Sequence, residues 1–435
     1  MSRLPATSPL RSAAASAHPG ALPHGITPPT PAMPATRTAG ATPRRRSWLL
    51  KAGLALALGL AVLGLPAGSA APPQARAAEA GPAPEPDWHA VSLGPEESLQ
   101  LPDGFQIGVF SRDLPGARFM TVGPDGDLYV SLMSGGKIVR LPDRDMNGQT
   151  DGAVTVASGL NNPHGLAFHD GSLYVGETNR VSRLTDTDGD GVYETAQPLT
   201  DLPSGGGHST RTVGFGPDGM LYVSVGSSCN VCVEKDERRA AILQLGPDGS
   251  NPRIYARGLR NAVGFVFQPG TGDLWATNNG RDQLGDDEPP ETVNLVHDGD
   301  NFGWPSCVNG RYPDPQFGRP GACDGVTRPA VEMQAHSAPL GLEFYQGSAF
   351  PADYQGNLFV AFHGSWNRSI PTGYKVVRIP FTDGRPSGDV QDFVVGWQGP
   401  SSVWGRPVDV LTGPDGSLFI SDDKNGWIYR VTYRG

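Results

Sequence analysis

Histidine and arginine side chains stand at similar places before several strand-like repeats of this 435-residue chain. His208 follows three glycines and precedes the repeat that begins at Gly216, and His164 stands before the preceding repeat. A neutral imidazole can accept a proton from a substrate hydroxyl, so His208 is a candidate general base. Arg260 and Arg406 precede two later repeats, and guanidinium groups bind anionic ligands. The pattern predicts that these side chains share one rim, although a histidine that only hydrogen-bonds a turn is the alternative.

The repeats that must position these side chains consist of a turn followed by a short alternating strand. The first is GPDGDLYVS at 123–131, and the others lie at 169–177, 216–224, 270–278, 354–362 and 413–421. A second alternating segment, such as KIVRL at 137–141, follows most copies. A basal period in the forties is typical of a four-stranded blade. We therefore expect an all-β six-bladed β-propeller. The number of blades is the least firmly based part, since divergent repeats within residues 91–110 could hide a shared closing strand.

The N-terminal part of the chain has a different composition from the repeats. Residues 1–43 are rich in Ala, Pro, Ser and Thr and have no periodic hydrophobicity. Three arginines at 44–46, an apolar run at 52–65 and small residues up to 77 then match the parts of an export signal. The paired arginines resemble a twin-arginine signal, with Sec export as the alternative. The apolar run is too short for a membrane span.

These features predict three regions. Residues 1–77 form an extension plus export signal, 78–88 form a linker, and 89–435 form a single propeller domain. We expect a mature protein that starts near Ala78 in the periplasm or medium, and Met33 is an alternative translation start. No lipobox cysteine is present for a lipid anchor.

The charge balance restricts the partners of the exported part. The chain has 34 Lys and Arg against 44 Asp and Glu, and residues 1–77 contain eight of the basic residues and no acidic one. The remainder therefore has 26 basic against 44 acidic residues, a net charge of −18. Such an acidic domain disfavours nucleic acid as a partner. It is compatible with Ca²⁺, which takes oxygen ligands.

The four cysteines form two local pairs, Cys229 with Cys232 and Cys307 with Cys323. A zinc ribbon needs two close pairs, and the second pair is too widely spaced for one. Oxidising compartments favour disulfides. We predict two disulfides; a redox-active CxxC motif is the alternative, but no βαβ pattern surrounds it.

Two acidic loops follow strands that end in Arg-Leu. One places Asp186, Asp188 and Asp190 at alternate positions, with Glu194 further on, and the segment 143–148 is similar. Oxygen side chains in this spacing can converge on one hard cation, although the spacing is not that of an EF-hand. An Asp-rich turn without a metal is the alternative.

From about Leu101 to its C-terminus, the chain resembles the soluble quinoprotein glucose/sorbosone dehydrogenases. The resemblance is carried by the motifs GHS at 207–209, RGLRN at 257–261, DDE at 286–288, NFGWP at 301–305 and GRPV at 405–408. Members of this family are six-bladed propellers that bind pyrroloquinoline quinone (PQQ) and calcium.

The resemblance implies roles for individual residues. His208 matches the base that takes the hydroxyl proton while hydride passes to the quinone. Arg260 matches the arginine that polarises the quinone oxygens, and Asn261 is its neighbour. The backbone carbonyls around Gly280 and Arg281 match the loop that holds the cofactor-bound calcium.

The chain also departs from the family pattern at the expected cofactor carboxylates. Arg406 matches one arginine of a pair there, with Trp404 in place of the other. Asn162 and His164 lie in the stretch where the glucose enzymes have a glutamine, and the lysine that contacts the cofactor has no counterpart. His363 and Arg368 are candidates to replace it, which favours a sorbosone-type or broader aldose substrate.

The sequence thus predicts an exported quinoprotein oxidoreductase that acts on an aldose or a related sugar or alcohol, with an unknown electron acceptor. A calcium-dependent lactonase-like hydrolase is one alternative, but it needs several carboxylates around a central metal. A non-catalytic binding propeller is the other, because a fold alone does not determine function.

Overall fold

The computed structural model describes residues 86–95, 97–399 and 402–435. Residues Ala80–Gly435 form one compact unit, and the predicted export signal lies outside the described residues. Within the described part, no helix is long and apolar enough to cross a membrane. Regular structure there is almost entirely strand, with one short 3-10 helix, η1 (Ala352–Tyr354).

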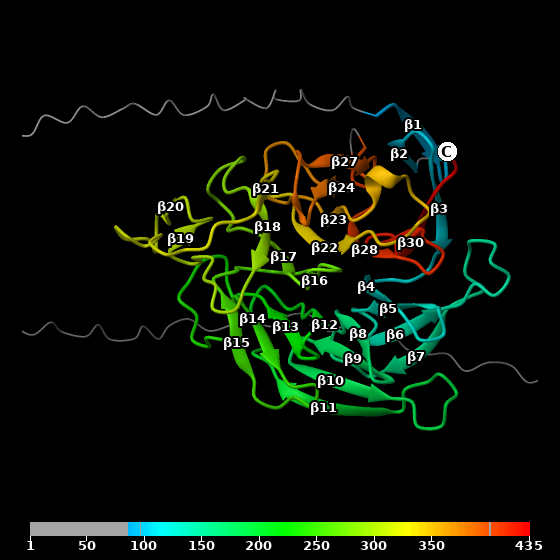
Figure 1. Ribbon diagram of the computed structural model, residues 1–435, viewed down its shortest axis with the longest axis horizontal. Coiled ribbons are helices and arrows are strands. Elements are labelled where there is room, and N and C mark those ends of the chain that lie inside the picture. Colours follow the sequence, from blue (N-terminus) through cyan, green and yellow to red (C-terminus); the bar gives the residue numbers. More distant parts are fainter. Residues whose placement is uncertain (1–85, 96, 400–401) are drawn as a thin grey trace, which may run out of the picture. The chain divides into compact units, whose positions relative to one another are not determined.

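Six four-stranded antiparallel sheets are arranged as the blades of a propeller, which confirms the predicted fold (Figure 1). Blades 1 to 3 are continuous in sequence. Blade 1 consists of β4 (Ala117–Val122), β5 (Leu128–Leu132), β6 (Lys137–Leu141) and β7 (Val154–Ser158). Blade 2 consists of β8 (Leu166–His169), β9 (Ser172–Glu177), β10 (Arg180–Thr185) and β11 (Thr195–Asp201). Blade 3 consists of β12 (Val213–Phe215), β13 (Leu221–Val225), β14 (Ala241–Leu245) and β15 (Arg253–Arg257).

Blades 4 to 6 contain the long insertions and the closure of the ring. Blade 4 consists of β16 (Phe265–Phe267), β17 (Leu274–Asn278), β18 (Glu291–Val296) and β21 (Val331–Met333). Blade 5 consists of β22 (Pro339–Phe344), β23 (Leu358–Phe362), β24 (Lys375–Ile379) and β27 (Gln391–Val394). Blade 6 consists of β28 (Pro407–Thr412), β29 (Leu418–Asp422), β30 (Trp427–Tyr433) and β3 (Phe105–Ser111). The strand that closes the ring is β3, which pairs with β30 from Phe105↔Tyr433 onward.

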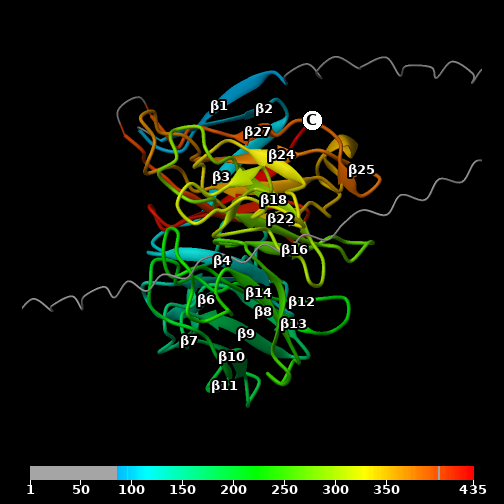
Figure 2. The same cartoon turned by 90° about the vertical axis from the view of Figure 1, so that its left-hand side faces the viewer.

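Three additional two-stranded sheets decorate the blades: β1 (Trp88–Ser92) with β2 (Ser98–Pro102), β19 (Cys307–Val308) with β20 (Tyr312–Pro313), and β25 (Phe381–Thr382) with β26 (Arg385–Pro386). The β1–β2 pair lies beside β27 of blade 5, through an isolated bridge between Gln100 and Val395 (Figure 2). Both predicted disulfides are confirmed, and no cysteine is free.

The repeated turn is explained by its aspartate and its glycines. In blade 3, the Asp218 carboxylate accepts hydrogen bonds from the Met220 amide at 3.1 Å and the Tyr222 hydroxyl at 3.0 Å. Gly219 has a φ of +71°, which side-chain-bearing residues rarely adopt. A Cβ on Gly216 would fall 2.7 Å from the Tyr222 ring. The turn sequence is therefore fixed by the aromatic residue that follows it.

The aromatic residues of the repeat join each blade to the next. Each one packs in a hydrophobic cluster with strands of the following blade, and the last, in blade 6, packs against blade 1. These residues are Tyr129, Tyr174, Tyr222, Trp275, Phe359 and Phe419. Burial of such large rings makes a major contribution to core stability. The core is thus a ring of six interfaces between blades.

The innermost strands β4, β8, β12, β16, β22 and β28 all begin at the same face of the ring, because every blade repeats the same order of antiparallel strands. In Figure 1 these strands lie nearest the centre of the blades. The segments that enter the innermost strands carry the candidate histidines and arginines. The fold therefore gathers them at one face.

Candidate active site

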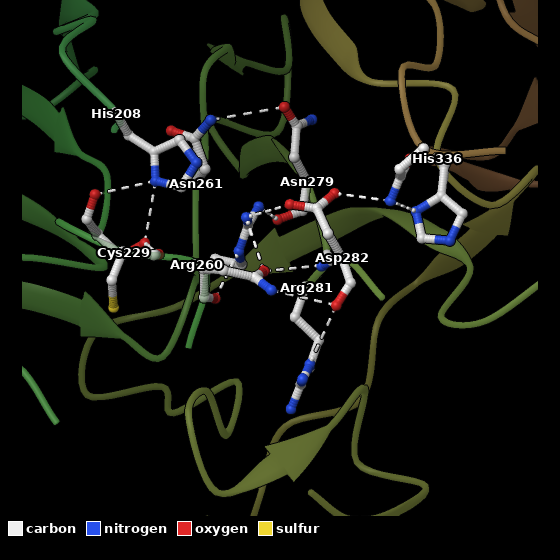
Figure 3. Close-up of polar contacts among 12 residues, drawn as sticks. His208, Cys229, Arg260, Asn261, Asn279, Arg281, Asp282 and His336 are labelled. Carbon is white, nitrogen blue, oxygen red and sulfur yellow. Dashed lines mark hydrogen bonds and ion pairs between the residues drawn. The ribbon is translucent and has the colours of Figure 1, made fainter. Parts of the chain in front are cut away.

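His208 lies directly before β12 and is held in one tautomer. Its Nδ1 is 2.9 Å from the carbonyl oxygen of Ser227 and 3.0 Å from the Ser227 hydroxyl (Figure 3). A carbonyl oxygen only accepts, so Nδ1 carries the proton and Nε2 carries the lone pair. In the described part of the chain, Nε2 has no hydrogen-bond partner. The imidazole therefore presents an open proton acceptor.

The charge state of His208 agrees with that role. Burial, followed by the positive charge of Arg260, lowers the pKa of His208 to about 4 from its ordinary 6.5. The imidazole is consequently neutral at neutral pH. A neutral imidazole can accept a proton, whereas an imidazolium cannot.

Arg260 is fixed by three residues on two different loops. Its Nε donates to the Asn230 carbonyl at 2.9 Å, and its Nη1 donates to the Asn279 carbonyl at 3.3 Å. Its Nη2 donates to the Asn230 side chain at 3.0 Å and forms an ion pair with Asp282 at 2.9 Å. The side chain is only 6% exposed. This cation is therefore held in a single orientation.

Asn261 lies next to His208 and contacts Asn279 (Figure 3). Its backbone amide donates to the Asn278 side chain at 3.0 Å, and its Nδ2 lies 3.5 Å from the Asn279 Oδ1. A Cβ on Gly226 would fall 2.4 Å from Asn261 Oδ1 and 2.6 Å from His208 Cβ. Glycine at 226 therefore allows the base and Asn261 to approach each other.

The loop after β17 contains the two backbone carbonyls expected to bind calcium. The Gly280 amide donates to the Glu291 carboxyl group at 2.6 Å, and Arg281 forms an ion pair with Asp314 at 2.5 Å. Among the described residues, neither the Gly280 carbonyl nor the Arg281 carbonyl accepts a hydrogen bond. These two oxygens are thus available as ligands for a hard cation.

A second cluster surrounds Arg406 at the start of β28. Its Nε donates to the His363 carbonyl at 3.0 Å and its Nη2 to the Gly364 carbonyl at 3.2 Å. The His363 Nε2 lies 2.9 Å from Asp423, which also forms an ion pair with Arg118 at 2.7 Å. Burial lowers the pKa of His363 to about 4, so this imidazole is neutral at neutral pH, and the ion pair of Asp423 is with Arg118. A second carboxylate, Asp422, accepts from the Arg406 backbone amide at 2.9 Å.

The stretch from His363 to Arg368 connects the two clusters. His363 contacts Asp423, and four residues later the Asn367 side chain donates to Asp282, the partner of Arg260, at 3.0 Å. Arg368 itself forms an ion pair with Asp287 at 3.1 Å. The two residues predicted to replace the missing lysine, His363 and Arg368, thus lie in different surroundings. His363 lies beside Arg406, whereas Arg368 connects two loops.

His164 is completely buried and does not face an opening. Its Nε2 is 3.4 Å from Arg118 Nη2, its Nδ1 is 3.4 Å from the Thr212 hydroxyl, and its ring lies 4.2 Å from the Phe119 ring. Burial lowers its pKa well below 6.5. This geometry supports Arg118; contact of His164 with a cofactor stays a prediction.

The acidic loop between β10 and β11 has converging carboxylates. One oxygen from each of its four acidic residues lies within 4.8 Å of the others, and these residues are Asp186, Asp188, Asp190 and Glu194. The 143–148 loop has the same hydrogen bonds: Asp143 accepts from the Gly148 amide at 3.0 Å, as Asp186 does from the Gly191 amide at 2.9 Å. Metal binding by these loops stays a prediction.

Several polar residues of the site were missed in the sequence. Arg118 stands before the first repeat, so the same pattern that indicated Arg406 could have found it. Asp423 and Asp282 are partners of arginines, and nothing in their local sequence distinguishes them from other surface aspartates. Asn230 lies between the cysteines of a predicted disulfide, where only the fold reveals its contact with Arg260.

Comparison with known proteins identifies the family. The sequence model described as Glucose / Sorbosone dehydrogenase matches residues 168–430. The chain belongs to the glucose/sorbosone dehydrogenase family. This confirms the assignment made from the sequence motifs.

The relatives of this chain include one uncharacterised protein and two proteins named as sugar dehydrogenases. An uncharacterised protein of Borreliella burgdorferi is 30% identical over 365 residues, which cover 79% of this chain and 94% of the relative. The PQQ-dependent pyranose dehydrogenase of Coprinopsis cinerea is 23% identical over 412 residues, or 78% of this chain and 55% of the relative. The aldose sugar dehydrogenase of Escherichia coli is 26% identical over 254 residues, or 53% and 62%.

Solved structures have the same fold. The holo PQQ domain of the Coprinopsis cinerea pyranose dehydrogenase superposes with a TM-score of 0.69 at 21% identity, covering 78% of this chain and 98% of that one. The PQQ-bound aldose sugar dehydrogenase of Streptomyces coelicolor gives 0.58 at 20% identity, covering 76% and 99%. At these identities the likeness establishes the propeller architecture.

Proposed function

We propose that this chain is an exported quinoprotein oxidoreductase that oxidises an aldose, or a related sugar or alcohol, by hydride transfer to PQQ. The observation that carries the proposal is the state of His208. Its Nδ1 proton is bonded to Ser227, its Nε2 is open, and its pKa is about 4. Family membership and the names of the relatives support the choice of cofactor and substrate class.

The rim of the propeller fits an anionic cofactor such as PQQ, which carries carboxyl groups. Arg406 is the main observation: among the residues that the structure describes, its guanidinium donates to the backbone carbonyls of His363 and Gly364 and forms no ion pair with a carboxylate. Planar guanidinium groups bind carboxylates well. When bound, PQQ would supply the electrophilic quinone that accepts hydride from the substrate carbon. Arg406 and Arg260 would hold it.

The chain's own residues would then act on the substrate hydroxyl. The His208 Nε2 would accept the hydroxyl proton as the carbon–oxygen single bond becomes a carbonyl. The Ser227 carbonyl, which accepts from Nδ1, would stabilise the imidazolium formed in that step. Arg260 cannot rotate away, because four hydrogen bonds fix it, so its charge acts without reorganisation.

We assign calcium to two places. The open carbonyls of Gly280 and Arg281 would bind an ion beside the cofactor, and the carboxylates of the loop at 186–194 would bind a structural ion. The region 44–77 would direct export, in keeping with the two disulfides of the domain.

Reconstitution tests the proposal. Purified apoprotein receives PQQ and Ca²⁺, and the quinone absorption is followed as each of a panel of aldoses is added. Bleaching by an aldose, and turnover with an artificial electron acceptor, are the expected results. A bound quinone whose spectrum no aldose or alcohol changes would refute the assignment.

A pair of histidine variants then tests the base. His208→Gln keeps a hydrogen-bonding side chain but cannot take a proton, so kcat should fall by about 10² to 10⁴. Its kcat/KM should fall in parallel, as expected for an interaction made only in the transition state. His297→Gln, at a histidine whose side chain is 61% exposed, is the matched control and should leave kcat unchanged. Wild-type turnover by His208→Gln would exclude His208 as the base.

A further inference from the structure

A four-residue loop closed by the Cys229–Cys232 disulfide lies against the site, between β13 and β14. The side-chain oxygen of its second residue, Asn230, accepts a hydrogen bond from Arg260 Nη2. The sequence predicts this disulfide only as a structural cross-link. It also closes the loop that contacts the Arg260 guanidinium.

Asn230 contacts the site with both its backbone and its side chain. Its carbonyl accepts from Arg260 Nε at 2.9 Å and from Trp304 Nε1 at 3.2 Å. Its side-chain oxygen accepts from Arg260 Nη2 at 3.0 Å and from the Asp282 amide at 2.8 Å, and its Nδ2 donates to the Asp282 carbonyl at 3.2 Å. One residue thus binds two nitrogens of Arg260 and also the backbone of its ion-pair partner.

The loop is itself fixed at both ends. The Ser227 hydroxyl donates to the Cys229 carbonyl at 2.7 Å, and Ser228 donates to Glu234 through its amide at 2.5 Å and its hydroxyl at 2.8 Å. Ser227 is also the residue that fixes the tautomer of His208. The same short segment therefore orients both the candidate base and the candidate cation.

We propose that the Cys229–Cys232 loop is a positioning device, in which Asn230 holds the Arg260 guanidinium in its working orientation. An arginine side chain has many rotamers, and each fixed hydrogen bond removes some of that freedom before the ligand arrives. Asn230 acts through Arg260 and is not itself a catalytic residue. The effect on turnover rests on the proposed function, whereas the effect on Arg260 does not.

The first test uses the apoprotein, without cofactor or substrate. In ¹⁵N-labelled protein, the Arg260 Nε–H resonance is assigned by its loss in Arg260→Lys, and its hydrogen exchange is measured. Asn230→Ala removes the side-chain acceptor and retains the backbone carbonyl, so exchange should become about tenfold faster. Cys229→Ser/Cys232→Ser frees the whole loop and should accelerate exchange further. Unchanged exchange in folded Asn230→Ala would overturn the proposal.

The second test uses the reconstituted enzyme and a matched disulfide. Partners that orient a site residue typically contribute 10-fold to 100-fold in affinity or activity, so Asn230→Ala should lower kcat and PQQ affinity by that range. KM for the sugar should change little. Cys307→Ser/Cys323→Ser should lower the melting temperature and leave Arg260 exchange, kcat and PQQ affinity as in the wild type.

The outcomes separate the two hypotheses. If the wild-type protein oxidises no sugar with PQQ, the proposed function fails, and the exchange experiment still decides whether Asn230 positions Arg260. If the control disulfide variant alters Arg260 exchange as much as Asn230→Ala does, the effect is one of general stability and the positioning role is refuted.

Discussion

Asp409 should make the stability of the propeller fall in mild alkali. Its side chain is buried at the interface between β28 and β4, where its Oδ2 accepts from the Met120 amide at 2.9 Å. Burial raises the pKa of Asp409 to about 8 from 3.8, with a smaller contribution from Glu343. The folded protein therefore keeps a proton at neutral pH that the unfolded chain has already lost. The stabilising effect of that proton disappears as pH rises through 8.

The size of the effect follows from the two pKa values. Between pH 7 and pH 9.5, a group with a folded pKa of about 8 loses about 1.4 kcal/mol of stability, because each pH unit below the folded pKa contributes about 1.4 kcal/mol and pH 7 lies one unit below it. The unfolded chain does not titrate at this group in that window. With an unfolding entropy of about 2.1 cal/mol/K per residue over roughly 350 residues, the melting temperature should fall by about 2 °C.

The assay compares melting curves of the wild type and of Asp409→Asn at both pH values. Asparagine resembles the protonated acid in shape and charge, so the variant should lack this part of the pH dependence. The histidines of the site contribute little, since His208 and His363 are neutral in the folded protein and a histidine of the unfolded chain, with a pKa of about 6.5, is mostly neutral at pH 7. An equal fall in melting temperature for both proteins would refute the reasoning.

Two further predictions concern the calcium loops and the disulfides. Ca²⁺ should raise the melting temperature more than Mg²⁺ does. At a Ca²⁺ concentration one hundred times Kd, the gain in stability is about 2.7 kcal/mol, and Asp188→Ala should reduce this gain. A metal-loaded protein whose melting temperature does not change with EDTA would contradict the prediction. Removal of the wider disulfide, with a sequence separation of 16, should lower stability by about 3 kcal/mol, against about 2 kcal/mol for the tighter one, as urea unfolding can measure. The reverse order would show that loop length does not determine their contributions.

The architecture could be predicted because the turn and strand that build each blade are repeated in the sequence. Each aromatic residue of the repeat, such as Tyr222, follows a glycine-containing turn and packs against the next blade. Six copies therefore indicate six blades without knowledge of any contact between them. The strand β3 has no such repeat, and only its position before the first blade suggested that it closes the ring.

The site could be predicted only where its residues share the repeat's register. His208, Arg260 and Arg406 precede innermost strands and were found for that reason. The partners that determine their behaviour come from elsewhere: Asp423 reaches Arg118 across 305 residues, and Asn230 reaches Arg260 from a different loop. Such contacts arise when the ring closes, so no local pattern encodes them.

The closing strand β3 has a consequence for how the domain folds. Its partner β30 pairs Tyr433 with Phe105, so 328 residues separate the two strands that complete blade 6. Joining chain ends over that length opposes folding by about 5 kcal/mol of configurational entropy, and contacts at such separation slow the folding of a domain. A nascent chain that lacks its last strand therefore leaves β3 without a partner. Blade 6 can therefore be completed only after β30 has been synthesised.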